Sequence, residues 1–221
     1  MQHLQEDTIA AVATPTGAGG IGIVRVSGPK SAGIAKALTG RVPNPRRLLR
    51  TRFCDATGAP LDDGIALFFQ SPASYTGEDV LELQGHGGPM VMHQLLEEVT
   101  TLGARLARPG EFTERAFLNG KLDLVQAEAV ADLIGSQTQA AARASLRSLS
   151  GELSSILTAI SKEIEELRTY IEADIDFSEE PLDPLSETGT ANRLAGVQRD
   201  LARVLEQVRT GGLLGRGAAV V

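Results

Sequence analysis

The sequence has 221 residues, of which 42% are hydrophobic, so it is long enough for one large domain or two small ones with a sizeable core. Only 4% of the residues are aromatic and none is Trp, which predicts a core packed mainly from aliphatic side chains. The formal net charge of −7 excludes a protein that binds polyanions through its bulk charge, although a local patch can still contact nucleic acid.

The first part of the chain alternates short apolar runs with Gly/Pro turns, which is typical of strands. The apolar runs are Ile9–Ala13, Ile21–Val26, Ile65–Phe69 and Val80–Leu83. Between them, Ser31–Leu38 and Pro89–Leu102 have helical periodicity, and the second has Pro at its start and Gly103 just past its end. We therefore expect an α+β domain over residues 1–118.

From about Asn119 the pattern is helical. Asp123 and Gln126 have the spacing of a capping box that opens a helix over Leu124–Ile134. An apolar seam at spacings of three and four then runs from Ala142 to Ile171 and needs partner helices to cover it. Two prolines indicate a loop over Phe177–Ser186, and a further amphipathic helix follows from Leu194 to Val208. We assign residues 119–210 to a partial helical bundle. Residues 211–221 end like the start of a buried strand, and we expect them to lead into a larger protein.

The sequence also indicates a cellular compartment for the protein. The N-terminal residues show no basic region followed by an apolar run, and no apolar stretch approaches the roughly 18 residues that span a bilayer. We expect a soluble, cytoplasmic protein. Its single cysteine, Cys54, excludes an internal disulfide and favours a small buried side chain over a reactive thiol.

Two charged residues stand on predicted strands. Side chains alternate along Val80–Gln84, so Leu81 and Leu83 face the core and Glu82 points the other way. Arg25 shares a strand face with apolar neighbours and must reach water or a carboxylate, because an unpaired buried guanidinium is too costly. Two interpretations of Arg25 stay open, an internal ion pair with Glu82 or Glu111 and a fork that grips an anionic ligand.

Other motifs favour structural roles. The glycines of Gly17–Gly22 lack the Lys-Ser/Thr of a P-loop and precede a strand, so we expect a tight turn. His86 lies in a Gly-His-Gly-Gly turn with no evident nucleophile, and no metal-ligand spacing joins it to another histidine. A basic run favours a solvated loop, with a phosphate-contact patch as the alternative. Its members are Arg41, Arg46, Arg47, Arg50 and Arg52.

Four longer stretches match a known family in the same order, namely Asp7–Pro15, Gly19–Gly28, Tyr75–Pro89 and Ala107–Ile134. Through them the sequence resembles the tRNA-modification GTPase family MnmE, also called TrmE, over essentially its whole length. The resemblance implies an N-terminal α+β domain that dimerises, binds 5-formyl-tetrahydrofolate and has a fold similar to folate-dependent aminomethyltransferases. A helical domain follows, interrupted by a Ras-like GTPase domain.

The resemblance also implies a reaction. With the flavoprotein MnmG, such proteins install an aminomethyl-type group on C5 of the wobble uridine of certain tRNAs. GTP, Mg²⁺ and K⁺ belong to the GTPase domain, whose Walker A loop is absent from these 221 residues. We therefore expect a fragment that neither binds nor hydrolyses GTP.

Carried over by position, the folate contacts of the family fall on Arg25, Glu82 and Lys121. One departure is Ala18, where the family often has a basic residue in its first glycine loop. No catalytic residue and no metal ligand is assigned. Two alternatives remain: a self-contained one-carbon transferase with His86 or Asp79 as base, and a helical scaffold that uses the apolar seam.

Overall fold

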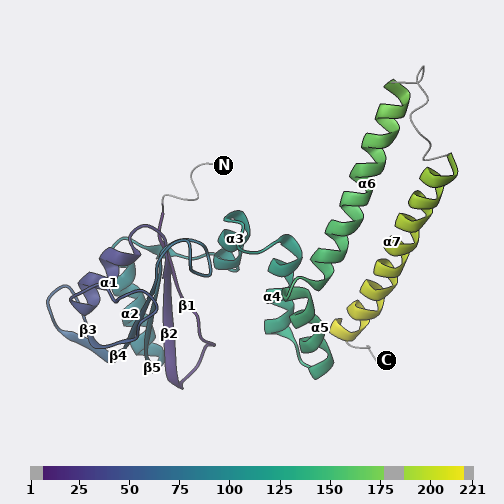
Figure 1. The fold of residues 1–221 in the computed structure, drawn as a ribbon. Helices are drawn as coiled ribbons and strands as arrows, with labels where there is room; N and C mark the ends of the chain where they lie inside the picture. Colours follow the sequence, from purple (N-terminus) through teal and green to yellow (C-terminus); the bar gives the residue numbers. More distant parts are fainter. Residues whose placement is uncertain (1–6, 177–186, 217–221) are drawn as a thin grey trace. The chain divides into compact units, whose positions relative to one another are not determined.

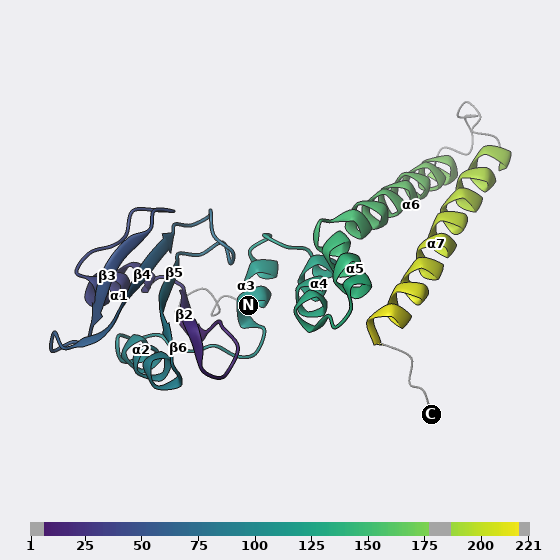
Figure 2. The ribbon, with the colours of Figure 1, turned by 90° about the horizontal axis from the view of Figure 1, so that it is seen from below.

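The computed structural model describes residues 7–176 and 187–216. They form two compact units that divide between Leu122 and Asp123. The N-terminal unit is a mixed sheet with helices, and the described part of the second unit consists of helices (Figures 1 and 2). The predicted fold class, an α+β domain followed by a helical domain, is confirmed.

The sheet of the N-terminal unit has six strands in the order β3-β4-β5-β2-β1-β6. Neighbouring strands are antiparallel except for the parallel pair β1 and β6. The strands are β1 (Ile9–Val12), β2 (Gly19–Ser27), β3 (Leu49–Cys54), β4 (Pro60–Phe69), β5 (Val80–Gly87) and β6 (Arg105–Leu106). Strands β2 and β5 therefore lie side by side inside the sheet, 57 residues apart between their paired members Arg25 and Glu82.

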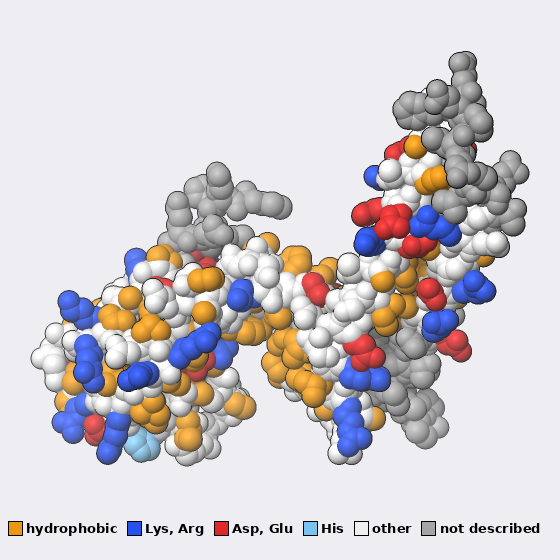
Figure 3. All heavy atoms as spheres, in the orientation of Figure 1, with side chains coloured by type: hydrophobic (Ala, Val, Ile, Leu, Met, Phe, Trp, Pro, Cys, Tyr) orange, Lys and Arg blue, Asp and Glu red, His pale blue; other side chains and the backbone are white. Residues whose placement is uncertain are grey.

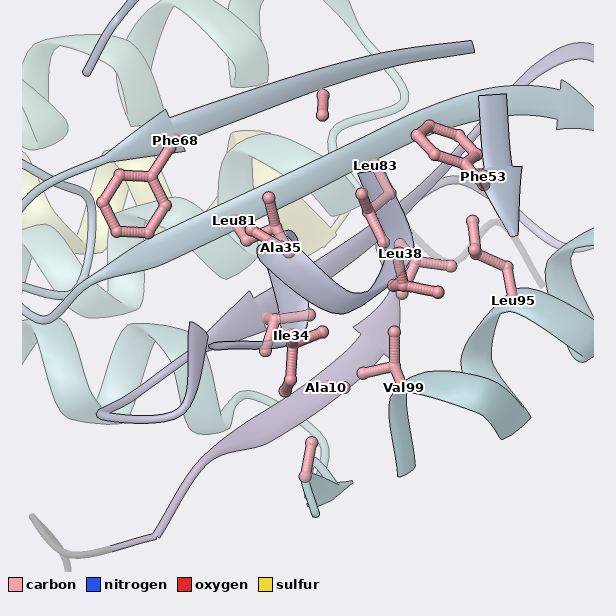
Figure 4. Close-up of a cluster of buried hydrophobic side chains, with 14 of the residues drawn as sticks. Ala10, Ile34, Ala35, Leu38, Phe53, Phe68, Leu81, Leu83, Leu95 and Val99 are labelled. Carbon is pink, nitrogen blue, oxygen red and sulfur yellow. The ribbon is translucent and has the colours of Figure 1, made fainter. Parts of the chain in front are cut away.

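One face of this sheet is covered by helices α1 (Ser31–Thr39) and α2 (Pro89–Thr101). Leu81 and Leu83 of β5 point toward these helices and are fully buried, as their alternation predicts. Figure 4 shows them among side chains from α1, α2 and the neighbouring strands. The core is aliphatic apart from Phe53 and Phe68, in keeping with the composition. The opposite face carries Arg25 and Glu82, and α1 and α2 leave it uncovered.

Two predicted loops are strands. Arg50 and Arg52 belong to edge strand β3, in which Phe53 is buried. The expectation of a solvated loop is therefore wrong for these two of the five arginines in the basic run. The predicted turn at His86 is also wrong, because β5 continues through Gly87. Glycines permit this extension, since a Cβ on Gly87 would lie 2.6 Å from the backbone oxygen of Ile21 on β2.

The second unit contains α4 (Leu124–Gly135), α5 (Gln139–Leu149), α6 (Glu152–Asp176) and α7 (Glu187–Arg216). The capping box predicted for α4 is present, because the Asp123 side chain accepts from Gln126 N–H and the Gln126 side chain accepts from Asp123 N–H. A small core joins α6 to α7 through Ile160, Leu167, Val197 and Val204.

The continuous seam predicted over Ala142–Ile171 is wrong in one respect. The helix ends after Leu149 and restarts at Glu152, because Gly151 takes φ = 86°, a left-handed conformation that glycine adopts at helix ends. The predicted loop Phe177–Ser186 and the last residues, 217–221, lie outside the described residues. Among the helices that the structure describes, none combines the length and apolar character needed to cross a membrane.

Candidate functional site

The centre of the site is an ion pair between the two innermost strands. The register of β2 and β5 places Arg25 directly opposite Glu82. Glu82 Oε1 accepts a hydrogen bond from Arg25 Nε at 2.9 Å and lies 2.7 Å from Arg25 Nη2 in the ion pair. The Glu82 side chain is 15% exposed and that of Arg25 is 30% exposed, so the pair is partly shielded from water. Of the two partners considered for Arg25, Glu82 is the one that the structure pairs with it.

This pair keeps unused hydrogen-bonding groups. Within the described residues, Glu82 Oε2 and Arg25 Nη1 have no hydrogen-bond partner. One acceptor and one donor therefore remain available on the sheet face that α1 and α2 leave uncovered. Such a donor–acceptor pair suits a ligand edge that itself carries both N–H and C=O groups.

Two aromatic rings flank the guanidinium group. The Cζ of Arg25 lies 5.6 Å from the ring centroid of Tyr75 and 5.7 Å from that of Phe112. Tyr75 lies before β5, and Phe112 lies in α3 (Glu111–Leu118). A 2.9 Å hydrogen bond between the Tyr75 hydroxyl and Thr113 Oγ1 ties the two segments together. Both contacts are within the cation–π range. Neither ring was predicted as a site residue, although both lie inside the matched stretches of a chain with few aromatics.

Lys121 is not bonded to the ion pair. Its Nζ donates to the backbone oxygen of Pro72 at 3.0 Å, and the side chain is exposed. The methylenes of Lys121 also approach Gly77, where an added Cβ would lie 3.3 Å away. The loop of residues 71–79 is therefore a common neighbour of Arg25 and Lys121, because its Tyr75 contacts Arg25 and its Pro72 and Gly77 contact Lys121.

An ion network with a buried centre at Glu111 and Arg115 joins this loop to helix α3. We call it the Arg115 network, and its members are Asp7, Glu78, Arg105, Glu111 and Arg115. Arg115 donates to Asp7 Oδ1 at 2.6 Å, to Glu78 Oε1 at 3.1 Å and to Glu111 Oε1 at 3.3 Å. Arg105 meets both oxygens of Glu111 with its two terminal nitrogens. The network was not predicted, because most of its pairs join residues far apart in the chain.

These contacts favour the ionised form of the Glu111 carboxylate. The hydrogen bonds from Arg105 contribute most to lowering the pKa of Glu111 to about 2, against the opposing effect of burial. Glu78 also accepts from Ser27 Oγ at 2.6 Å, which attaches the loop to the end of β2. The network therefore holds the loop that carries Tyr75 and the helix that carries Phe112 beside the ion pair.

His86 belongs to a second polar cluster. Asp62 Oδ1 lies 2.7 Å from His86 Nδ1, and Asp62 Oδ2 accepts from the backbone N–H of His86 at 2.7 Å. The Asp62 side chain is 9% exposed whereas that of His86 is 72% exposed, so the imidazole is oriented through Nδ1 and presents Nε2 to solvent. The carboxylate raises the pKa of His86 above its ordinary value.

The structure also places the other residues that the sequence suggested as candidates for catalysis or metal binding. Asp79, considered as a base, accepts from the backbone N–H of Ser71 and closes the loop between them. Cys54 is partly buried and free. In the part of the chain that the structure describes, no group of three or more His, Cys, Asp or Glu side chains is arranged to hold a metal ion.

Comparison with known proteins decides the family. Residues 8–121 match the family described as GTP-binding protein TrmE N-terminus, and residues 124–219 match the MnmE helical domain. The chain belongs to the MnmE family. The matched ranges leave out only the first and last few residues and the two residues between the domains.

Curated relatives agree over the same span. The tRNA modification GTPase MnmE of Thiobacillus denitrificans is 54% identical over 97% of this chain. The proteins of that name from Azoarcus sp. and Hydrogenovibrio crunogenus are 56% and 53% identical over 97% and 100% of it. The match covers 48% or 49% of each relative, so the chain spans about half the length of these MnmE proteins.

Proposed function

We propose that the N-terminal unit binds a one-carbon tetrahydrofolate, 5-formyl-tetrahydrofolate or a close relative, at Arg25, Glu82 and Lys121. The observation that carries the proposal is the Arg25–Glu82 pair on the uncovered sheet face, with an open acceptor on Glu82 and an open donor on Arg25. A pterin edge offers the complementary N–H and C=O groups.

The neighbouring side chains suit the rest of such a ligand. Tyr75 and Phe112 provide flat apolar surfaces beside the ion pair, which favours a planar ring system. Lys121 is bonded to Pro72 of the loop of residues 71–79 and is exposed, as a contact to the carboxylates of a glutamate tail requires. The residues present thus fit a folate, and the ligand would supply the one-carbon unit.

The wider role rests on the relatives. They are named tRNA modification GTPases, so we propose that this chain acts within a protein that modifies the wobble uridine of tRNA together with the flavoprotein MnmG. Homodimerisation through the N-terminal unit and a cytoplasmic location are part of the same proposal. GTP hydrolysis, with its Mg²⁺ and K⁺, we assign to the part of the relatives that this chain does not match.

Calorimetric titration of the 221-residue chain with 5-formyl-tetrahydrofolate tests the site. Each charge-assisted hydrogen bond is worth about 1.5–3 kcal/mol, so Glu82→Gln and Arg25→Ala should each weaken binding by more than about tenfold. Arg52→Ala is the matched control, because Arg52 also pairs with a carboxylate across two strands, that of Asp63 on β4. Equal affinity in wild type and Glu82→Gln, or an equal loss in the control, would contradict the assignment.

A second candidate function is one-carbon transfer by this chain alone, for which the Asp62–His86 pair is the specific observation. A buried carboxylate that orients an exposed imidazole is an arrangement suited to general acid–base catalysis. Incubation of the chain with a one-carbon folate and an RNA containing the target uridine tests it. Product formed by wild type and lost in His86→Gln supports this function, and no product without a partner protein rejects it.

A further inference from the structure

The positively charged residues of this acidic chain are concentrated in one part of its sequence. Between residues 8 and 54 there are eight Lys or Arg side chains and no Asp or Glu, whereas the whole chain has a net charge of −7. Five of the eight are arginines within twelve residues, and we call them the basic surface: Arg41, Arg46, Arg47, Arg50 and Arg52. All five are exposed.

The fold places the basic surface on strand β3, at one edge of the sheet, and on the connection that leads into it. Arg50 and Arg52 alternate with inward-facing residues and so share one face of the strand. Arg46 anchors the connection, because its backbone N–H donates to the oxygen of Phe68 at 2.8 Å. Figure 3 shows Lys and Arg side chains gathered over this part of the N-terminal unit, with few acidic ones among them.

Most of this charge is not used inside the molecule. Arg52 pairs with Asp63, and Arg46 donates to the backbone oxygen of Ala73. Among the described residues, the side chains of Arg41, Arg47 and Arg50 have no hydrogen-bond or ion-pair partner. Three guanidinium groups are therefore free to meet negative charge from another molecule.

Protection of the sheet edge does not account for the basic surface. Charged side chains on an edge strand prevent strand-to-strand association, and one or two are sufficient for that purpose. Here Arg41, Arg46 and Arg47 precede the strand and guard no edge hydrogen bonds. Arg46 moreover takes φ = 58°, a left-handed backbone that costs energy for a residue other than glycine.

We propose that the basic surface binds the phosphate backbone of RNA. Free arginines suit this partner, because the planar guanidinium group meets two phosphate oxygens at once. The proposal rests on the proposed function, in which a tRNA is the substrate of the whole protein. The negative charge of the rest of the chain then restricts RNA contact to this surface.

Fluorescence anisotropy of the 221-residue chain tests the proposal, with a labelled unmodified transcript of a tRNA that has uridine at its wobble position. The expected result for Arg47→Ala/Arg50→Ala is binding about tenfold weaker, with a log–log salt dependence shallower by about 1.5 to 2. Arg47→Lys/Arg50→Lys should retain most of the affinity, because the charge remains.

Two controls separate the basic surface from general effects. Arg143→Ala/Arg199→Ala removes the same charge from exposed helix positions in the second unit, and Leu48→Ala removes an apolar group 61% exposed beside the basic surface. Both should bind RNA like wild type. An equal loss in the Arg143/Arg199 control would overturn the proposal. Unchanged RNA affinity in the Arg47/Arg50 variant would also overturn it. So would tighter binding of polyglutamate than of the tRNA transcript, because the partner of the basic surface would then be an acidic protein.

Folate titration of the same variants separates the two proposals. Arg47→Ala/Arg50→Ala should bind 5-formyl-tetrahydrofolate like wild type, and Arg25→Ala should bind RNA like wild type. If the wild-type chain binds RNA as expected but does not bind 5-formyl-tetrahydrofolate, only the folate site is contradicted. If the wild-type chain binds the folate but not RNA, only the basic surface is contradicted.

Discussion

Replacing Glu111 by Gln removes one negative charge from the buried centre of the Arg115 network while keeping the shape of the side chain. Glu111 is 1% exposed and accepts hydrogen bonds from Arg105, from Arg115 and from the backbone N–H of Arg108. Arg115, itself 2% exposed, then depends on its remaining partners Asp7 and Glu78. We expect the substitution to destabilise the N-terminal unit and leave the second unit unchanged.

The size of this effect follows from the pKa of Glu111. Its pKa falls from the ordinary 4.5 to about 2 in the folded protein. At 1.36 kcal/mol per pKa unit, the ionised form contributes about 3 kcal/mol to the free energy of unfolding at pH 7. Removing one partner of a buried ion pair costs about 3–5 kcal/mol, which agrees with this value.

The pH dependence has a definite sign. A lowered folded-state pKa means that the unfolded chain binds more protons, so the contribution is complete above the unfolded pKa and is lost as pH falls toward 2. The difference in stability between wild type and Glu111→Gln should therefore shrink by about 2 kcal/mol between pH 7 and pH 3.

Hydrogen-exchange pulse labelling across a urea series measures this difference. Mass spectrometry of peptides from β2 and β5 reports the N-terminal unit, so unfolding of the helices in the second unit does not enter the value. Glu114→Gln is the matched control, because Glu114 lies on the same helix in an exposed pair with Arg108, and it should cost less than about 1 kcal/mol. A loss below 1 kcal/mol for Glu111→Gln at pH 7, or a difference independent of pH, would refute the reasoning.

Four further substitutions test other parts of the structure. Gly64→Ala should destabilise the N-terminal unit by about 1–3 kcal/mol, because the new Cβ would lie close to a backbone oxygen of β5. Gly33→Ala, in open space on α1, should stabilise the same unit by about 0.5–1 kcal/mol, and urea unfolding compares the two. Asp62→Asn should lower the pKa of His86, measured by NMR titration of its imidazole; an unchanged pKa would disprove the pairing. Asp123→Ala should remove about 1 kcal/mol of N-cap stabilisation from α4, so amide hydrogen exchange in the first turn of this helix should become faster. An unaltered exchange rate would contradict the capping box.

Local signals in the sequence were sufficient for many elements. Apolar runs bounded by glycine located β1, β2 and β5, and the capping box located the start of α4. Strand β3 was missed, because its exposed arginines resemble a charged loop although they alternate with Thr51 and Phe53. The end of β5 was missed because glycine is ambiguous, marking a turn or a close approach of two strands.

Part of the candidate site could likewise be predicted from the sequence, and part could not. The sequence by itself marked Arg25 and Glu82 as charges on apolar strands, because the alternation of apolar and polar residues is visible in neighbouring residues. It left two partners open for Arg25, since a pairing across 57 residues depends on strand register. Tyr75 and Phe112 contact Arg25, and Asp7 contacts Arg115 across 108 residues, only after the loop and α3 have packed against the sheet. Tertiary structure decided these contacts, because each depends on where the sheet brings distant segments together.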